Sequence, residues 1–325
     1  MTTAAFDVLG IGNAIVDVLS RADDAFLSQH GLVKGSMMLI DQERAETLYA
    51  AMGPGVEVSG GSCGNTMAGV ASFGGKGAYV GKVRNDQLGA VFGHDLKSMG
   101  VSFETAAAKE GPATARCLIL VTPDAQRTMN TYLGACTGLG PADIDPKVVG
   151  AAQVTYVEGY LWDAPEAKKA VLKAFDAAHA AGRLVSITLS DSFCVHRYRE
   201  EFRDLIRDKV DILFGNEAEI KSLYEVETFE EAMEATRKEA RIAALTRSEK
   251  GSVVLRGSET YTVPAAPVAR VVDTTGAGDL YASGFLFGYT HAQPLAECAR
   301  LGGLAAAEVI SHVGARPEQA LRTLV

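Results

Sequence analysis

Short apolar runs typical of buried strands alternate with helical stretches over most of this chain, and that alternation constrains its fold more than any other feature. Two of the helices are legible from the spacing of their apolar residues, in residues 164–181 and 228–240. Such alternation predicts parallel β-α-β units with right-handed crossovers, and helices on both faces of a central sheet. The runs that we expect to be strands are residues 6–11, 76–80, 116–121, 153–157, 184–188, 210–214, 241–246 and 252–255.

Two stretches break this rhythm, residues 19–59 and 111–134, where short strand-like runs alternate with polar and turn residues. We interpret them as a small β-rich lid. The larger α/β domain then comprises residues 1–18, 60–110 and 135–325, and a chain of 325 residues has room for both parts. The predicted fold class is α/β, with three α/β/α layers, a mostly parallel central sheet and the small lid.

Charge, hydropathy and cysteine content exclude several classes of protein. The chain has 31 basic and 40 acidic residues, a formal charge of −9 and no block rich in Lys or Arg, so we expect no nucleic-acid partner. No run approaches the roughly 18 apolar residues that span a membrane, and residues 1–5 have no secretory pattern, so we expect no membrane partner. The five cysteines are widely spaced and include no Cys-x-x-Cys pair, which favours the reducing cytoplasm.

Residues 274–279, which contain two glycines, are the best candidate for a phosphate-binding segment. The apolar run 280–287 follows at once and suits a buried helix, so the glycines lie at a helix entrance. Backbone N–H groups and the helix dipole favour an anion there. Two rival schemes fail, because a dinucleotide-binding turn at residues 10–15 lacks its third glycine and a Walker loop ending at Lys82 lacks the hydroxyl residue that binds magnesium.

Asp279 is expected in the first turn of that helix, where a carboxylate stays ionised. In phosphoryl transfer a carboxylate orients and deprotonates the attacking hydroxyl, while fixed donors stabilise the transferring group. We therefore predict Asp279 as the catalytic base and the amides of Gly276, Ala277 and Gly278 as an anion hole. A plain helix cap is the alternative that the local residues leave open.

The same segment resembles the C-terminal signature of the ribokinase-like (PfkB) family of carbohydrate and nucleoside kinases, and the resemblance covers essentially the whole chain. Further family marks occur in order: a glycine-rich signature at residues 60–65, a glycine-to-glycine stretch at 81–89 and an Asn-x-x-Glu motif at 216–219. Within the family, the stretches that resemble the adenosine kinases are residues 188–193, 210–217 and 284–298.

The resemblance implies a ribokinase-like fold and ATP-dependent phosphorylation of the 5′-hydroxyl of adenosine, with AMP and ADP as products and Mg2+ as cofactor. In many relatives it also implies a monovalent cation such as K+. The alternatives are a kinase for a free sugar resembling ribose or fructose, a kinase for guanosine or inosine, and a nucleoside-binding sensor without chemistry. As partners we expect the small-molecule substrate, in a monomer or a homodimer located in the cytoplasm.

By the resemblance, Asp17 holds the ribose hydroxyls at the end of the strand formed by residues 6–11, helped by Gly61 and Asn65 of the glycine-rich loop. A carboxylate accepts two hydrogen bonds from a vicinal diol, which agrees with that role. For Asp17 and Asn65 the alternative is a helix cap or a turn residue.

Four further residues are assigned to the substrate: Asn13, Ser62, Arg127 and Phe193. Arg127 is expected to lie over the transferring phosphate, and Phe193 to stack on the base. The alternatives are a turn residue for Asn13, an exposed turn arginine for Arg127 and a core side chain for Phe193.

Asn216 and Glu219 follow the strand predicted at residues 210–214, at the edge where a parallel sheet binds ligands. The resemblance assigns Asn216 to ATP and Glu219 to Mg2+ through water, since oxygen ligands suit that ion. An N-cap asparagine with a surface glutamate three residues on is the structural alternative.

The loop of residues 246–251 resembles the loop that receives the nucleotide phosphates, through Thr246, Ser248 and Gly251. The family usually has glycine in place of Ser248. The remaining assignments by resemblance are Gly314 in the adenine pocket and, around the monovalent cation, Asp273 and Thr275.

Overall fold

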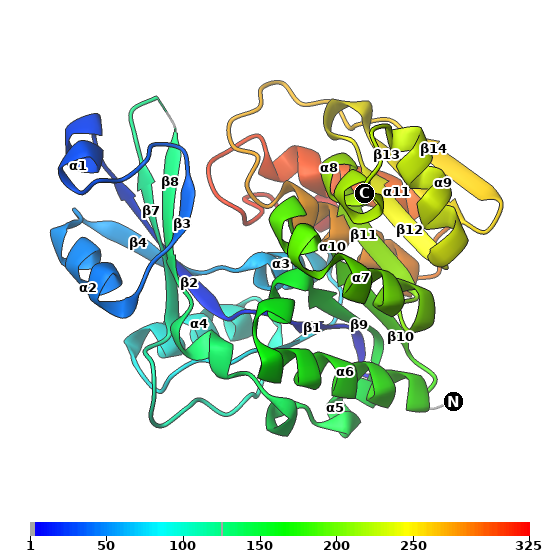
Figure 1. Ribbon diagram of the computed structural model, residues 1–325, viewed down its shortest axis with the longest axis horizontal. Coiled ribbons are helices and arrows are strands. Elements are labelled where there is room, and N and C mark those ends of the chain that lie inside the picture. Colours follow the sequence, from blue (N-terminus) through cyan, green and yellow to red (C-terminus); the bar gives the residue numbers. More distant parts are fainter. Residues whose placement is uncertain (1–3, 125) are drawn as a thin grey trace.

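The computed structural model describes residues 4–124 and 126–325, and two β-sheets organise this part of the chain (Figure 1). In the larger sheet the order of strands is β14-β13-β12-β11-β10-β9-β1-β5-β6, and every pair from β12 to β6 is parallel. β13 runs antiparallel to its neighbours β12 and β14, so the predicted mostly parallel sheet is confirmed. Its strands are β1 (Phe6–Ile11), β5 (Gly77–Val80), β6 (Ser102–Phe103), β9 (Ala152–Glu158), β10 (Leu184–Thr188), β11 (Ile212–Asn216), β12 (Ile242–Thr246), β13 (Ser252–Arg256) and β14 (Glu259–Val263).

Helices cover both faces of this sheet, because each buried strand presents apolar side chains alternately to either side. Leu9 and Ile11 of β1 belong to the core under α5 (Pro146–Gly150), α6 (Pro165–Ala180), α7 (Ser192–Asp208), α8 (Glu217–Tyr224) and α9 (Phe229–Glu239). Val8 belongs to the opposite core, under α3 (Ser62–Phe73), α4 (Gln87–Ser98), α10 (Ala277–Thr290) and α11 (Leu295–Val309). The three α/β/α layers are therefore confirmed, and α6 and α9 are the two helices predicted from apolar spacing.

The smaller sheet lies to one side of the larger, at the left of Figure 1, with α1 (Asp24–Gln29) and α2 (Gln42–Ala51) beside it. Its order is β3-β8-β7-β2-β4, from strands β2 (Ile15–Arg21), β3 (Met37–Leu39), β4 (Gly55–Ser59), β7 (Ala115–Val121) and β8 (Arg127–Tyr132). These strands fall within residues 15–59 and 115–132. The exact domain boundaries stay a prediction.

The position predicted for Asp17 in the fold is wrong. The first strand ends at Ile11, and Asp17 lies in the middle of β2, paired with Val58 of β4 and Cys117 of β7. Gly12 and Asn13 end the pairing of β1, after which the chain crosses into the smaller sheet. Asp17 therefore belongs to the smaller sheet.

Two glycines let the helices behind the site approach closely. A Cβ atom on Gly69 of α3 would lie 2.2 Å from the Ser283 hydroxyl oxygen of α10, and one on Gly284 would lie 2.5 Å from the Leu301 carbonyl oxygen of α11. Because neither position has room for a side chain, α3 packs closely on α10 at Gly69, and α10 packs closely on α11 at Gly284.

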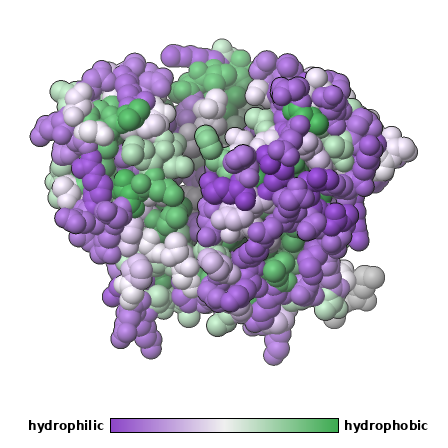
Figure 2. All heavy atoms as spheres, viewed as in Figure 1, coloured by the Kyte–Doolittle hydropathy of each residue, from purple (hydrophilic) through white to green (hydrophobic). Residues whose placement is uncertain are grey.

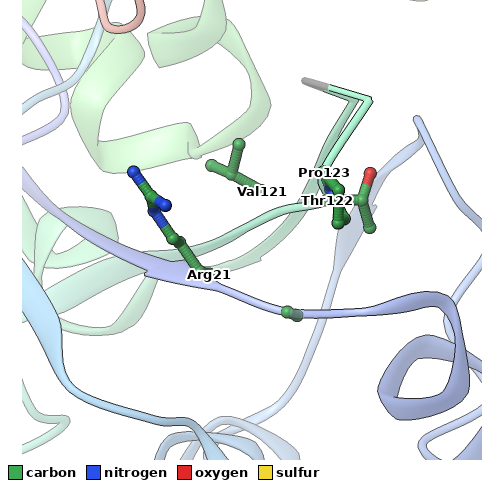
Figure 3. Close-up of a pocket in the computed structure, with 5 residues that line it drawn as sticks. Arg21, Val121, Thr122 and Pro123 are labelled. Atoms are coloured by element: carbon green, nitrogen blue, oxygen red, sulfur yellow. The ribbon is translucent and has the colours of Figure 1, made fainter.

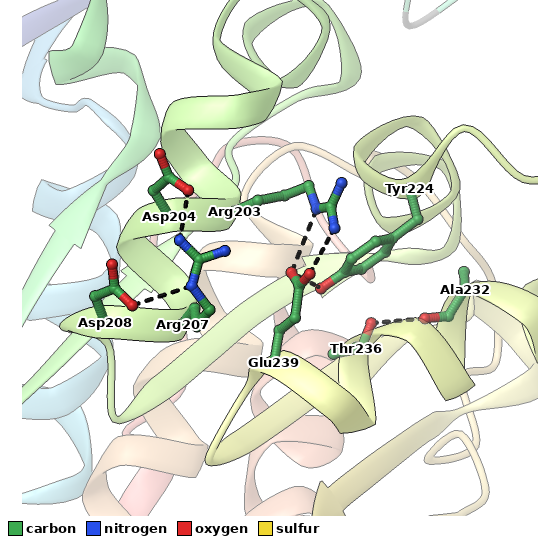
Figure 4. A network of polar contacts seen from close by, with 8 residues as sticks. All are labelled: Arg203, Asp204, Arg207, Asp208, Tyr224, Ala232, Thr236 and Glu239. Carbon is green, nitrogen blue, oxygen red and sulfur yellow. Dashed lines mark hydrogen bonds and ion pairs between the residues drawn. The ribbon is translucent and has the colours of Figure 1, made fainter.

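A polar network ties α7, α8 and α9 together on the other face of the sheet (Figure 4). Arg203 donates to Glu239 at 2.6 Å, and the Tyr224 hydroxyl donates to the second oxygen of Glu239 at 3.1 Å.

No helix within residues 4–124 or 126–325 has the length and apolarity needed to cross a membrane.

Candidate functional site

Asp279 lies at the N-terminal end of α10, as predicted, and side chains of α3 hold it. Its Oδ1 accepts a hydrogen bond from the Ser62 hydroxyl at 2.6 Å, and its Oδ2 accepts one from the Asn65 side-chain amide at 2.9 Å. Burial raises the pKa of Asp279 above its ordinary value, and the two hydrogen bonds and Arg316 oppose that rise. The carboxylate is thus oriented from two sides and keeps a raised affinity for a proton.

Asn65 also presents an unused acceptor at this point. The residue is 5 % exposed, and within the described part of the chain its buried Oδ1 has no hydrogen-bond partner. Buried polar atoms are nearly always satisfied in the functional state. A hydroxyl of a bound ligand is a donor that would satisfy Oδ1 beside the Asp279 carboxylate.

The predicted amide cradle needs one refinement. The Ala277 amide already donates to the Thr274 carbonyl at 3.2 Å, whereas the amides of Gly276, Gly278 and Asp279 have no partner among the described residues. Gly276 has a φ of 78° and lies against Ala315, so it must be glycine. The space beside Gly278 is open, which leaves room for an anion.

Asp17 meets this centre from the smaller sheet. A Cβ on Gly60 would lie 2.4 Å from the Asp17 carboxyl carbon, so only glycine lets the loop 60–61 pass the carboxylate, and Gly61 packs equally closely on the Asn13 carbonyl. Burial raises the pKa of Asp17 to about 6, Arg316 and Arg127 lower it, and the charge of Asp279 raises it.

Arg316, which sequence reasoning missed, is the cation shared by the two aspartates. Its guanidinium donates to the Ser59 carbonyl at 3.0 Å and to the Gly64 carbonyl at 2.7 Å, so it clamps the ends of the glycine-rich loop. Burial lowers its pKa, and the charges of Asp17 and Asp279 oppose that decrease. No local pattern marks Arg316, because its partners lie more than 250 residues earlier in the chain.

Glu158, also missed, lies under the loop that carries Asn13. Its Oε1 accepts the backbone N–H of Asn13 at 2.9 Å and the side-chain amide at 2.7 Å, and its Oε2 accepts the N–H of Cys63 at 2.9 Å. Burial raises its pKa to about 7. An acidic residue directly after the strand predicted at residues 153–157, at the edge where a parallel sheet binds ligands, was the available signal.

A second polar group joins Arg127, Asp273, Thr275 and Gly314. The Asp273 carboxylate accepts the Thr275 N–H at 3.0 Å and hydroxyl at 2.7 Å, and the Gly314 N–H at 2.9 Å. Arg127 forms an ion pair with it, and both side chains are 8 % exposed. The Arg127 side chain is therefore buried, so an exposed turn arginine is excluded. Burial alone would raise the pKa of Asp273, but the hydrogen bonds from Gly314 and Thr275 and the charge of Arg127 outweigh it, so the pKa is lowered.

Asn216 and Glu219 form a reciprocal capping box at the start of α8. The Glu219 N–H donates to Asn216 Oδ1 at 2.9 Å, and the Asn216 N–H donates to Glu219 Oε2 at 3.0 Å. The cap expected as the structural alternative is present, but Glu219 is 6 % exposed rather than on the surface. Burial raises its pKa to about 7, and Asn216 lies beside Thr246 at the C-terminal ends of neighbouring strands.

Backbone conformation explains the residues of the loop 246–251. Ser248 has a φ of 50°, a left-handed conformation that glycine adopts more easily than serine. Gly251 has a φ of 83°, and a Cβ on it would lie 2.1 Å from the Val263 carbonyl oxygen. The loop turns sharply at the C-terminal end of β12.

Phe193 is 76 % exposed, so the core alternative is wrong and stacking on a ligand stays a prediction.

The surface is hollowed between the parts built on the two sheets (Figure 2). A separate pocket of about 360 Å³, lined by Arg21, Val121 and Pro123 among others, lies at the outer ends of β2 and β7 (Figure 3). It contains none of the predicted site residues.

Comparison with known proteins agrees with this architecture. Residues 32–321 match the family described as pfkB family carbohydrate kinase. The chain is similar to a probable sugar kinase from Rhizobium etli, 54 % identical with a TM-score of 0.92, over 99 % of this chain and 98 % of that one. It is also similar to an adenosine kinase from Sinorhizobium meliloti, 56 % identical with a TM-score of 0.91, over the same shares. A 5-dehydro-2-deoxygluconokinase from Geobacillus kaustophilus is 27 % identical over 264 residues, 78 % of each chain.

Proposed function

Because the chain belongs to the pfkB family of carbohydrate kinases, and is a phosphotransferase with an alcohol group as acceptor, we propose that it transfers the γ-phosphoryl group of ATP to the 5′-hydroxyl of adenosine, giving AMP and ADP. The observation that carries the proposal is the Asp279 carboxylate, held by Ser62 and Asn65 at the N-terminus of α10. The unused Asn65 oxygen beside it supports a hydroxyl as the group to be bound.

In this mechanism Asp279 accepts the proton of the attacking hydroxyl. Its raised pKa suits a base, because proton transfer is most efficient when the pKa of the base approaches the working pH. The free amides of Gly276, Gly278 and Asp279, together with the dipole of α10, face the charge that develops on the transferring group. Asp17 accepts hydrogen bonds from the ribose hydroxyls, and the small sheet acts as the lid over them.

Adenosine is preferred over a free sugar on the strength of the adenosine kinase from Sinorhizobium meliloti, which is 56 % identical to this chain. The probable sugar kinase from Rhizobium etli, 54 % identical, keeps a sugar acceptor as the second candidate. An exposed Phe193 favours the nucleoside, because a flat aromatic side chain stacks on a base and gains little from a sugar alone.

The residues present fit an Mg2+ ion that arrives with ATP. Magnesium takes oxygen ligands and is usually bound by one or two carboxylates together with phosphates and water. Glu219 is a buried carboxylate at the ligand edge of the sheet, and burial raises its pKa. Both of its oxygens accept hydrogen bonds from Asn216, so Glu219 would hold the ion through a water molecule. An Mg2+ ion held there would neutralise charge on the phosphates.

The Asp273 carboxylate does not fit K+ while the ion pair with Arg127 is closed. Both of its oxygens already accept hydrogen bonds, and the guanidinium supplies the positive charge. A cation on this carboxylate would have to displace Arg127.

We place the proposed reaction in the cytoplasm, because cysteines stay reduced there and the five cysteines of this chain are free and buried.

The test is an ADP-release assay with Mg-ATP and adenosine, guanosine, inosine, ribose or fructose at equal concentrations. We expect the highest kcat/KM with adenosine. A higher value with ribose or fructose would move the function to the sugar kinases, and binding of adenosine without ADP release would identify a sensor.

A further inference from the structure

Glu158 is a buried carboxylate that the proposed mechanism leaves without a role. It is the last residue of β9 and is 1 % exposed. Both of its oxygens accept backbone donors, from Asn13 on one side and from Cys63 on the other. A Cβ on Gly12 would lie 2.6 Å from Glu158 Oε2, so this carboxylate reaches its partners only because position 12 is glycine.

Glu158 caps α3 from another element. The N-cap residue Gly61 has no side chain, and α3 has no side-chain cap of its own. The first N–H groups of a helix need an acceptor, and a negative charge there is favourable to the helix dipole. The Glu158 carboxylate supplies both at Cys63, the second residue of α3.

The first turn of α3, which Glu158 caps, carries the two side chains that hold Asp279. Ser62 precedes Cys63, and Asn65 follows two residues later on the same turn. We propose that Glu158 is a positioning residue for phosphoryl transfer, because its carboxylate fixes Asn13 and the first turn of α3 and thereby the two donors that orient Asp279. This inference rests on the proposed role of Asp279 as the base.

The surroundings of Glu158 make its charge sensitive to pH near neutrality. Burial raises its pKa to about 7, the hydrogen bonds from Asn13 and Cys63 oppose this, and the charge of Asp279 adds to it. Burial also raises the pKa values of the Cys63 and Cys136 thiols and of the Tyr79 phenol, so these neighbours stay neutral. Protonation of Glu158 would remove an acceptor from Asn13 or Cys63.

The experiment compares Glu158→Gln with the wild-type protein, using the best acceptor found in the ADP-release assay, between pH 6 and pH 8.5. At the alkaline end we expect kcat to fall by about 10- to 100-fold, since a small displacement of reacting groups has effects of that size. KM for the acceptor changes less. The ratio of the two kcat values shrinks as the pH falls through about 7, because protonated Glu158 in the wild type then resembles glutamine.

Asp211→Asn is the matched control. Asp211 is a buried carboxylate, 5 % exposed, that accepts the Val185 N–H at 2.9 Å and an Arg241 donor at 2.7 Å beside the N-terminal end of β11. We expect the substitution Asp211→Asn to lower the unfolding temperature and to leave kcat and KM unchanged.

An unchanged kcat for Glu158→Gln, or a ratio that does not depend on pH, would overturn the positioning role. Glu158→Asp, which keeps the charge but withdraws the carboxylate by one methylene, provides the same kcat comparison if the glutamine variant does not fold. Absence of ADP release by the wild type with every acceptor would overturn the proposed function, and the positioning role with it.

Discussion

At the scale of single residues, the Asp279 carboxylate is subject to two opposing influences. Burial raises its pKa, and the hydrogen bonds from Ser62 and Asn65 lower it. The first makes the carboxylate a stronger base, whereas the second holds it in one orientation. A base needs both properties. Mutation of a residue that donates to Asp279 would change its pKa and its orientation.

Asp279→Asn removes the proposed base at nearly constant volume. We expect kcat to fall by about 10²- to 10⁴-fold, the range for general-base catalysis. The dissociation constant for adenosine, measured by calorimetry, stays within a few-fold because Asp17 and Asn65 are unchanged. A variant with near-normal turnover would show that Asp279 only caps the helix.

Ser62→Ala tests how the base is tuned. The Ser62 hydroxyl lowers the pKa of Asp279, so its removal raises that pKa further. The acid limb of the kcat–pH profile should move to higher pH, since Asp279 must be deprotonated to act. A limb that stays in place or moves to lower pH would contradict the assignment of that limb to Asp279.

At the scale of elements, the site depends on the N-termini of two crossing helices. α3 brings Ser62 and Asn65, α10 brings Asp279, and Gly69 lets the two helices touch. The amides at the start of α10 and the Asp279 carboxylate can therefore act on the same ligand only while the distance between α3 and α10 stays the same.

Gly69→Ala should push the two helices apart. Its new Cβ would lie 2.2 Å from the Ser283 hydroxyl oxygen and 2.8 Å from Leu280 Cδ1. Overpacking of this kind costs about 1–3 kcal/mol, and we expect kcat to fall as well because the donors to Asp279 move. Chemical denaturation and the ADP-release assay measure the two effects.

Gly93→Ala on α4 is the control for this helix substitution. Its Cβ would lie 3.5 Å from the Phe103 ring, an ordinary contact, so stability should rise by about 0.5–1 kcal/mol, the usual gain from replacing a helical glycine. Equal losses of stability in both variants would show that the α3–α10 crossing has no special role.

At the scale of the whole molecule, the two sheets bring several carboxylates together away from water. Burial raises the pKa of Asp17 to about 6 and those of Glu158 and Glu219 to about 7. The folded state therefore holds protons that the unfolded chain releases. The contribution of these groups to stability is present at low pH and is lost as the pH rises through about 7.

Glu219→Gln should remove one of these titrations. Its ordinary pKa is 4.5, so the wild-type free energy of unfolding should lose up to about 3 kcal/mol more than that of the variant between pH 4.5 and pH 8. Urea denaturation at several pH values measures the two slopes. Identical slopes would show that Glu219 titrates normally in the folded protein.

Local patterns were sufficient for the elements whose periodicity is unambiguous. The strands predicted at residues 6–11 and 184–188 coincide with β1 and β10, and the apolar run after residue 279 lies within α10. β2 was missed because its residue types, Ile-Val-Asp-Val-Leu-Ser-Arg, do not alternate strictly between apolar and polar, although burial does alternate along the folded strand.

The sequence alone determined most strands of the larger sheet, the helices α6 and α9, the positions of the glycines that begin α3 and α10, and Asp279 as the leading candidate for the base, since hydrophobic period and backbone conformation are properties of neighbouring residues. Only the tertiary structure decided which charged and polar groups form hydrogen bonds with one another. Ser62 and Asp279 are 217 residues apart, Glu158 and Cys63 are 95 apart, and Arg316 and Ser59 are 257 apart. Such pairs depend on the order of strands in the sheets and on how closely the helices cross, and neither is written in any local stretch of the chain.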